Sequence, residues 1–545
     1  MKTCFKAVRL FAAASFAAIV SCASGDTINV PGDQPTIIDA VYAANPGDTI
    51  LIQSGVYDEA GQVYVWAPMT LTATNGPVKV HCTSDQEAVA EVASGVTDVA
   101  FNGITFERPS ANADWMRSFQ LNYGAHATFN NCAFQGPANG VGVIHFFGAS
   151  AAYYNCTFSN FNPTAGWSAA IFVEGKDANS PYSDIIVSNC LFDTGCNSWI
   201  RMSPFQSAPR VGAVSVRNTT FKAAMQPQAI AFWTPAPSTT MLEYNSTNAL
   251  LFQDCSFEGT SKPGGLNDEM EFYYTTNTAP PSLTFSRCNF KAYNSNSKMM
   301  YLDLPAPITF ENCLFGGGQH ETVMTVWGGP PSVNFYYCTM INDGVTAANS
   351  QSGTAQSTFV NGWDGGRTFN IVDSLFRCPT NFSAGFVCDP ASAGIRNYAV
   401  SNSVIDHPIP TGAFAQITLG TGGSTNISLA SAFVDPAAGN YQLTDGSPWV
   451  NGGIDLGYTL DLADNPRIQG GAPDMGAYES PYGALMPTIS LSSGAGSLTI
   501  TFTGILQSAA QVNGPFTDVN GAVSPLTISV PSSGNMFWRT RNPTP

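Results

Sequence analysis

A four-residue pattern, Asn-Cys-x-Phe, recurs along the chain and constrains the fold more than any other feature. Its full form begins at Asn131, Asn155, Asn189 and Asn312. Degenerate copies begin at Asn218, Asp254, Arg287, Tyr337, Asp373 and Asn402. Successive copies begin between 24 residues (131 to 155) and 36 residues (218 to 254) apart. This spacing is typical of a solenoid whose repeats carry loops of variable length.

Two columns of apolar residues precede each copy of the pattern. Five residues before the cysteine position stand Ala127, Ala151, Ile185, Val214, Leu250, Leu283, Ile308, Val333, Phe369 and Tyr398. Three residues before it stand Phe129, Tyr153, Val187, Val216, Phe252, Phe285, Phe310, Phe335, Ile371 and Val400. A spacing of two indicates a strand with one buried face.

The Cys and Phe positions form a second apolar pair that is one residue out of phase with the first. A continuous strand cannot bury both pairs, so the chain must bend between them. The residue just before the cysteine is usually Asn or Asp, which tolerate a left-handed backbone. We therefore predict that each repeat is a strand, a tight corner, a second strand and a longer return. Stacked repeats of this kind form a parallel β-helix with rungs about 4.8 Å apart.

The repeat covers about residues 100–405 and resembles the right-handed parallel β-helix of the pectin-lyase-like superfamily. The handedness comes from that resemblance. The stretches 28–31 and 55–59 resemble the usual opening of these proteins, which implies a short capping helix at about 35–44. The stretches 433–436 and 474–479 resemble the ending of bacterial extracellular β-helix proteins that often carry a C-terminal anchoring or sorting module.

We predict an all-β chain in four parts. Residues 1–23 are an export signal, and 24–480 are a single-stranded parallel β-helix whose last rungs and C-terminal cap lie in 406–480. Residues 481–488 are a linker. Residues 489–545 are a small β-sandwich-like module, because 497–502 and 526–530 alternate in hydropathy as short strands do.

The N-terminal residues have the pattern of a targeting segment. Lys2, Lys6 and Arg9 precede an apolar stretch, 10–20, that is too short to span a bilayer. Ser21-Cys22-Ala23 fits ordinary secretion, whereas 19–22 also resembles a bacterial lipobox with Cys22 as the lipidated residue. We favour plain export because strand-like sequence starts at Thr27. Both alternatives predict a secreted protein or one on the bacterial cell surface.

The net charge of the chain excludes some classes of binding partner. Lys and Arg number 21 against 38 Asp and Glu, a net charge of −17. This argues against nucleic acid and anionic membranes, and less strongly against polyanionic substrates. We expect a monomer that meets a polysaccharide or a cell-surface glycan.

Seven of the 13 cysteines fall in the one inward column of the repeat. We expect free buried thiols there, because parallel side-chain directions on adjacent rungs disfavour a bridge. Cys378 and Cys388 lie outside the column and are the best candidates for a disulfide. No Cys-x-x-Cys occurs and the five histidines are scattered, so we expect neither a metal nor a cofactor.

The superfamily includes lyases, polygalacturonases and pectin methylesterases, but their signatures are missing. The chain has no Asp-Asp, no Gly-His-Gly and no clustered basic pair. Residues 55–59 resemble the first methylesterase motif without the later ones, and we interpret them as a first-rung turn. If the chain hydrolyses a glycan, the candidate carboxyl pair is Asp303 with Glu271 (or Glu269), which sit on neighbouring rungs.

A further strand, which lies in each repeat before the two apolar columns and the corner, suggests a ligand-binding face. By alternation we predict as inward Ile144, Phe146, Ile171, Val173, Ile230, Phe232, Met300, Leu302, Met324 and Val326. We predict as outward His145, Phe147, Phe172, Glu174, Trp233, Phe272, Tyr274, Tyr301, Asp303, Trp327 and Trp363. The candidate substrate-binding residues are His145, Glu174, Trp233, Tyr274, Tyr301, Trp327 and Trp363.

Rings in a row stack on sugars, and carboxylates hold sugar hydroxyls. In the alternative interpretation, loops cover this face and make it a second core. Three functions stay open at this point. They are a glycan-binding protein, a polysaccharide hydrolase (favoured over a lyase) and a structural stalk or adhesin without a site.

Overall fold

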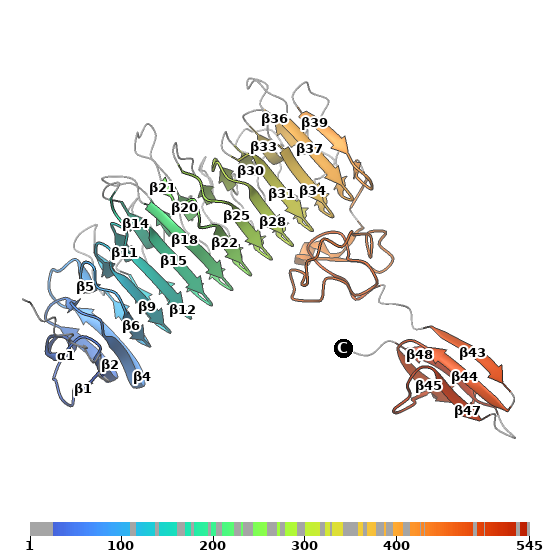
Figure 1. Cartoon of the computed structure of the whole chain (residues 1–545), viewed down its shortest axis with the longest axis horizontal. Coiled ribbons are helices and arrows are strands. Elements are labelled where there is room, and N and C mark those ends of the chain that lie inside the picture. Colours follow the sequence, from blue (N-terminus) through green and yellow to red (C-terminus); the bar gives the residue numbers. More distant parts are fainter. Residues whose placement is uncertain are drawn as a thin grey trace, which may run out of the picture.

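The computed structural model places the repeats as successive turns of a long parallel β-helix (Figure 1). It describes residues 25–108, 116–136, 141–160, 169–175, 179–193, 198–202, 210–222, 230–232, 243–258, 270–272, 278–291, 300–316, 322–326, 330–341, 358–362, 368–377, 386–388, 396–406, 415–425, 427–429, 431–482, 488–494, 496–529 and 535–541.

The strands of the β-helix form two parallel sheets, one of 12 strands and one of 28. The 12-stranded sheet contains β3 (Val63–Val65), β5 (Ala88–Val92), β8 (Arg117–Leu121), β11 (Val141–Phe146), β14 (Ala169–Glu174), β17 (Ser198–Met202), β20 (Ile230–Phe232), β24 (Met270–Phe272), β27 (Met300–Leu302), β30 (Thr322–Val326), β33 (Thr358–Gly362) and β36 (Phe386–Cys388).

The 28-stranded sheet consists of two files that meet at the corner. The file before the corner is β1 (Thr27–Val30), β2 (Thr49–Glu59), β4 (Thr70–Cys82), β6 (Val99–Asn102), β9 (His126–Asn130), β12 (Ser150–Tyr154), β15 (Ser183–Ser188), β18 (Arg210–Arg217), β21 (Glu243–Tyr244), β22 (Leu250–Gln253), β25 (Leu283–Ser286), β28 (Ile308–Glu311), β31 (Ser332–Tyr336), β34 (Thr368–Val372), β37 (Arg396–Ser401) and β39 (Ala415–Leu419). The long strands β2 and β4 continue through the corner, so that their second halves, 55–59 and 78–82, belong to the file after it. The file after the corner is β7 (Ile104–Glu107), β10 (Ala133–Gln135), β13 (Thr157–Ser159), β16 (Leu191–Phe192), β19 (Thr220–Phe221), β23 (Ser256–Glu258), β26 (Asn289–Lys291), β29 (Leu314–Gly316), β32 (Thr339–Ile341), β35 (Leu375–Arg377), β38 (Val404–Asp406) and β40 (Ser424–Thr425).

The predicted corner is confirmed at every copy of the repeat. The residue before the cysteine position has a positive φ, between 44° and 55°, at Asn131, Asn155, Asn189, Asn218, Asp254, Arg287, Asn312, Tyr337, Asp373 and Asn402. This left-handed turn reverses the alternation, so that the pairs before and after it both point inward.

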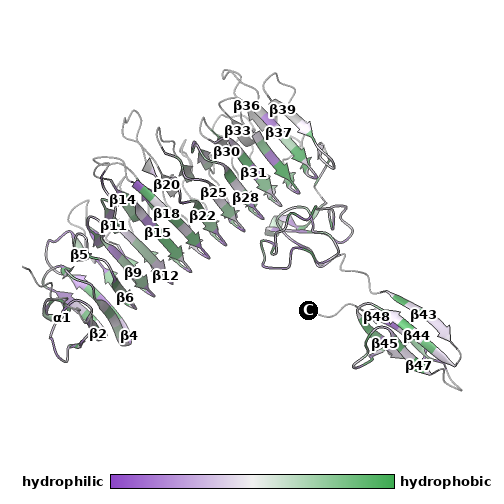
Figure 2. Ribbon diagram, in the orientation of Figure 1, coloured by the Kyte–Doolittle hydropathy of each residue, from purple (hydrophilic) through white to green (hydrophobic). Residues whose placement is uncertain are grey.

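Like residues stack on like inside the β-helix, and apolar positions follow the strands along its length (Figure 2). Phe192 stacks on Phe221 at 4.6 Å between ring centroids, and Phe290 stacks on Phe315 at 4.7 Å. Beside the ring stack run the predicted thiols, which are buried and free at Cys132, Cys156, Cys190, Cys255, Cys288, Cys313 and Cys338. Each thiol lies 3.4–3.5 Å from a carbonyl oxygen of the preceding rung, as Cys313 Sγ does from Phe285 O.

A short helix, α1 (Ile37–Ala43), covers the first rungs as expected from the sequence. Thr36 is its N-cap, and the buried Glu59 carboxylate accepts the N–H groups of Ile37 at 2.8 Å and Ile38 at 3.3 Å. Glu59 thus satisfies donors that a helix N-terminus leaves open. This contact gives residues 55–59, within β2, a structural role at the first rung.

Residues 431–482 form a lateral segment that adds no rung. It contains β41 (Phe433–Asp435), the 3-10 helix η1 (Pro436–Ala438) and β42 (Asn440–Leu443). Its apolar residues pack on Leu314, Ile341, Leu375 and Val404, which line the outside of the file after the corner. The last described rungs include β39 and β40, which lie within the range 406–480 predicted for the last rungs. Residues 431–482 lie beside the file after the corner, where we expected a cap on the end of the β-helix.

The C-terminal residues form two small antiparallel sheets. One contains β43 (Ile489–Gly494), β44 (Ser497–Phe502) and β47 (Leu526–Ser529), and the other β46 (Thr517–Asp518), β45 (Ile505–Ala509) and β48 (Phe537–Arg541). Ile500, Phe502 and Leu506 form a core that both sheets share. Within the described residues no helix is long and apolar enough to cross a membrane.

Candidate functional site

The outer surface of the 12-stranded sheet is built from residues that alternate with the core. Val63, Val65, Phe119 and Leu121 point inward. Between them the register aligns Tyr64 of β3 with Glu91 of β5 and Gln120 of β8. Alternation therefore places one ring, one carboxylate and one amide side by side on three consecutive rungs, facing away from the core.

We call Tyr64, Trp66, Glu91, Gln120 and Asn122 the N-terminal face. The side chains of Tyr64 and Trp66 are 39% and 40% exposed, so each ring offers a surface to solvent while its base is anchored. Trp66 Nε1 donates to Val41 O at 3.0 Å, which fixes the indole against α1. Tyr64 lies on β3 and Trp66 directly follows its last residue, so the two exposed rings are separated by one residue of the chain.

A chain of hydrogen bonds runs beside the rings. Asn122 Nδ2 donates to Glu91 Oε2 at 3.3 Å and to Val92 O at 2.9 Å. Gln120 Nε2 donates to Asn122 Oδ1 at 2.6 Å, and Arg117 Nε donates to Gln120 Oε1 at 2.7 Å. Each polar side chain of the face is therefore held in place by a neighbour.

Arg117 ties this network to further acidic residues. Its guanidinium is buried, forms an ion pair with Glu87 and lies 5.1 Å from the centroid of the Phe146 ring. Burial lowers the pKa of Arg117, while the charges of Glu87, Glu91 and Glu174 act in the opposite direction. Arg117 thus pairs directly with Glu87 and is influenced electrostatically by Glu91 and Glu174.

Glu174 lies at the end of β14 and is 4% exposed. Burial raises the pKa of its carboxyl to about 7, against an opposing effect of Arg117. This carboxyl therefore gains and loses its proton near neutral pH.

The prediction that His145 points outward is wrong. The side chain is fully buried, Nε2 lies 2.7 Å from the Tyr153 hydroxyl and Nδ1 lies 3.3 Å from Ala149 O. Burial lowers its pKa to about 4, so the imidazole is neutral. Hydrogen bonds on both nitrogens allow this polar ring to take an inward position, and His145 is unavailable to a ligand.

The phase of β11 is therefore opposite to the predicted one. Ile144 packs outside the sheet with Phe172 and Phe146 in a separate apolar cluster, and Ile144 and Phe172 are 1% exposed. The alternative of a second core on this face holds at β11 and β14. Phe272, predicted as outward, is also in the main core, where it packs on Phe252 and Phe285.

Other inward positions agree with the sequence, and several candidates are not described. Ile171, Val173, Met300, Leu302, Met324 and Val326 are in the core. Trp233, Tyr274, Trp327 and Trp363 lie outside the described residues, as does Cys378, while Cys388 is described only as the last residue of β36.

The predicted carboxyl pair spans neighbouring strands. Glu271 of β24 is in register with Tyr301 of β27, and Asp303 follows two residues later, where its N–H donates to Phe272 O at 2.8 Å. Asp303 is 8% exposed and Tyr301 is half-buried. Their catalytic and binding roles stay predictions.

The N-terminal face was missed in the sequence because the repeat is recognisable only from about residue 100. The signal was nevertheless present in Val63-Tyr64-Val65-Trp66, where two aliphatic residues alternate with two rings. Among the described residues, no group of three or more His, Cys, Asp or Glu is arranged to hold a metal ion.

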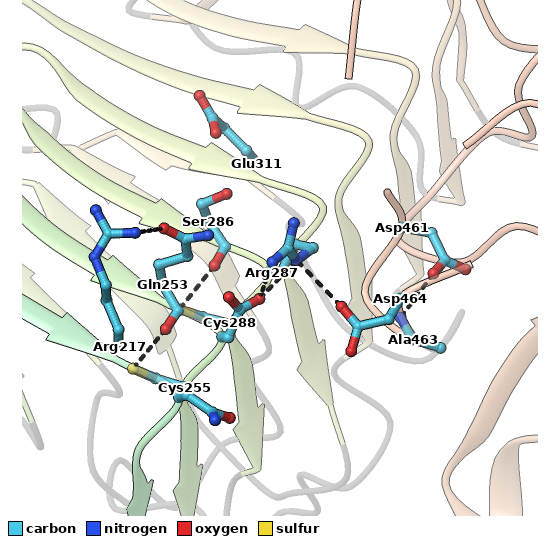
Figure 3. A network of polar contacts seen from close by, with 12 residues as sticks. Arg217, Gln253, Cys255, Ser286, Arg287, Cys288, Glu311, Asp461, Ala463 and Asp464 are labelled. Atoms are coloured by element: carbon cyan, nitrogen blue, oxygen red, sulfur yellow. Dashed lines mark hydrogen bonds and ion pairs between the residues drawn. The ribbon is translucent and has the colours of Figure 1, made fainter. Parts of the chain in front are cut away.

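A second polar network lies at the corner column (Figure 3). Arg287 Nε donates to Asp254 Oδ1 at 2.6 Å and lies 3.7 Å from Asp464 Oδ1 of the lateral segment. The Tyr337 hydroxyl accepts from Leu456 N at 3.3 Å, and Asp373 Oδ1 accepts from Ile454 N at 3.1 Å. Three corner residues that are not Asn, Arg287, Tyr337 and Asp373, thus bind the lateral segment. The corner Asn402 also binds it, because its Nδ2 donates to Gly452 O at 2.7 Å.

No protein-family model matches the chain, and no curated protein matches it. Similar solved structures include the pectate lyase Pel9A, at 13% identity over 81% of this chain and 90% of that one, with a TM-score of 0.28. The polygalacturonase of Erwinia carotovora is 10% identical over 74% and 95%, with a TM-score of 0.27. The Dettilon tailspike protein is 9% identical over 69% of each chain, with a TM-score of 0.35. These low scores carry no argument about function, and the strand pairing itself defines the fold.

Proposed function

We propose that this protein binds a polysaccharide or a cell-surface glycan through its N-terminal face. The observation that carries the proposal is the pairing of the exposed Tyr64 and Trp66 rings with the adjoining Glu91, Gln120 and Asn122 network. Sugar rings have apolar C–H faces that stack on aromatic side chains and hydroxyl edges that require hydrogen bonds. This surface offers both within three rungs, or about 10 Å along the axis of the β-helix.

Rigidity favours the proposal. Tyr64, Glu91 and Gln120 stand on paired strands. Trp66 and Asn122 directly follow the ends of β3 and β8, and each is tied to a backbone carbonyl. A ligand therefore loses little binding free energy to the ordering of side chains. The export signal predicted at the N-terminus would place this face outside the cell, either secreted or attached to a bacterial surface through Cys22.

Binding is tested by incubating the protein with a panel of insoluble glycans and measuring the protein left in solution. We expect depletion by at least one glycan, and Tyr64→Ala and Trp66→Ala should each weaken it about tenfold or more, equivalent to ~1.4 kcal/mol. Tyr154→Ala is the matched control, because Tyr154 is a half-buried ring on β12 of the other sheet. Binding that survives both face variants, or depends equally on Tyr154, would refute the location.

A second candidate function, hydrolysis of the glycan, is favoured by Glu174. A carboxyl whose pKa is raised to about 7 can donate a proton to a leaving oxygen near neutral pH. Release of reducing ends that is lost in Glu174→Gln would support this function, whereas unsaturated products would indicate a lyase. Asp303→Ala in the same assay tests the pair predicted from the sequence, which fails if activity is unchanged.

A further inference from the structure

We propose that the glycan bound at the N-terminal face carries no acidic groups. This inference rests on the proposed function and names the class of ligand: neutral or amine-bearing, as opposed to uronate or sulfated.

Each side-chain nitrogen of the face donates to another group of the protein, as Trp66 Nε1 does to Val41 O. Asn122 Nδ2 donates to Glu91 and to Val92 O, and Gln120 Nε2 donates to Asn122. Arg117 donates to Gln120 and pairs with Glu87, and its side chain is only 5% exposed. The groups that would attract a carboxylate are therefore already used within the protein.

The acceptors have capacity to spare. An ionised carboxylate accepts at about four lone-pair positions, and Glu91 Oε2 receives one bond from Asn122 at 3.3 Å. Glu87 meets Arg117 with one oxygen while its side chain is 69% exposed. Hydroxyl and ammonium groups donate to such acceptors, whereas carboxylates and sulfates only accept.

The negative charge around the N-terminal face also favours a ligand without acidic groups. Glu91 is in register with Tyr64, and Asp85 and Glu87 are exposed just before β5. The cation that pairs with Glu87 is the buried Arg117. An acidic polymer would bring further negative charge onto this surface and would be repelled. The formal net charge of −17 adds to the repulsion at longer range.

The test is affinity electrophoresis of the whole chain in gels that contain one soluble polymer each, in buffer of about 0.15 M ionic strength. Hydroxyethylcellulose, galactomannan, xyloglucan and glycol chitosan are the non-acidic probes, and polygalacturonate, alginate and hyaluronan are the acidic ones. We expect retardation by at least one non-acidic polymer and none by the acidic polymers. The retardation should fall about tenfold in Tyr64→Ala and stay unchanged in Tyr154→Ala.

A charge variant sharpens the result. Glu91→Lys should weaken binding of the non-acidic polymer and create retardation by an acidic one, whereas Asp193→Lys, far along the β-helix, should do neither. Retardation of the wild type by an acidic polymer that depends on Tyr64 would overturn the inference while leaving the proposed function intact. Retardation that is unchanged in Tyr64→Ala and Trp66→Ala would overturn both the inference and the proposed function. Absence of retardation by every polymer would also overturn both.

Discussion

Replacement of the buried Glu174 by Gln should change how the stability of the protein depends on pH. The folded-state pKa of about 7 exceeds the value of 4.5 for an unperturbed Glu, so the folded state holds its proton more tightly than the unfolded state. The stabilisation is therefore fully present below pH 4.5 and is lost as the pH rises through 7. A difference of 2.5 pKa units corresponds to at most ~3.4 kcal/mol, and we expect ~1–3 kcal/mol because the carboxyl is not completely shielded.

Glu174→Gln carries no charge at any pH and should lose this dependence. Relative to wild type, the variant should gain stability between pH 5 and pH 8.5, by about 1–3 °C in melting temperature for a β-helix of this size. The assay is thermal unfolding followed by circular dichroism at both pH values, with Asp85→Asn as an exposed control. If the difference between Glu174→Gln and wild type is the same at both pH values, the argument from burial is wrong.

Three further predictions concern the fold. Phe290→Ala should destabilise the β-helix by about 3–5 kcal/mol in urea, because the ring stacks on neighbours in both directions, and Phe290→Leu should lose clearly less. Asn155→Ala should lose about 1–2 kcal/mol, because φ is 55° there, whereas Asn155→Gly should lose almost nothing; equal losses would count against the corner. Gly476→Ala should release the lateral segment to limited proteolysis, because its Cβ would lie 2.6 Å from Thr339 Oγ1 at a φ of +91°. Gly457→Ala, at a φ of +83° with open space around it, should leave the segment protected, and similar cleavage of both variants would refute the contact.

The β-helix was predictable because the same requirement recurs at every rung. An inward pair, a left-handed corner and a second inward pair leave a pattern that ten copies make visible. Buried free thiols also followed from that pattern, since adjacent cysteines share one side-chain direction. Repetition, more than the strength of any single motif, carried the prediction.

The inward and outward residues of β11 and β14 were less predictable, because both surfaces of these strands are apolar. Alternation cannot decide which of two apolar sets is inward, and a histidine normally counts as outward. His145 is inward because Tyr153, on the next strand of the same turn, supplies a hydroxyl for its ring. Such a partner becomes visible only when the turn is closed in three dimensions.

The lateral segment escaped prediction for a different reason. Its contacts join residues more than 80 positions apart, such as Asp373 with Ile454 and Thr339 with Ala477. At three corners that bind the segment, Arg287, Tyr337 and Asp373 replace the usual Asn. At a fourth, Asn402 keeps the usual residue and gives no sign of the contact. These departures from Asn have no evident structural meaning until the residues that they contact are known.

Exposure of the buried thiol column would make unfolding of this protein irreversible. Within the folded protein each sulfur is enclosed and directed at a carbonyl of its neighbouring rung, so oxidants in the medium have no access to it. Once several turns open together, seven reduced cysteines become exposed on one unfolded stretch of chain, where an oxidant can join them in non-native pairs that block refolding. Outside a reducing compartment, survival of this protein is therefore governed by how rarely it opens and not by how well it would refold.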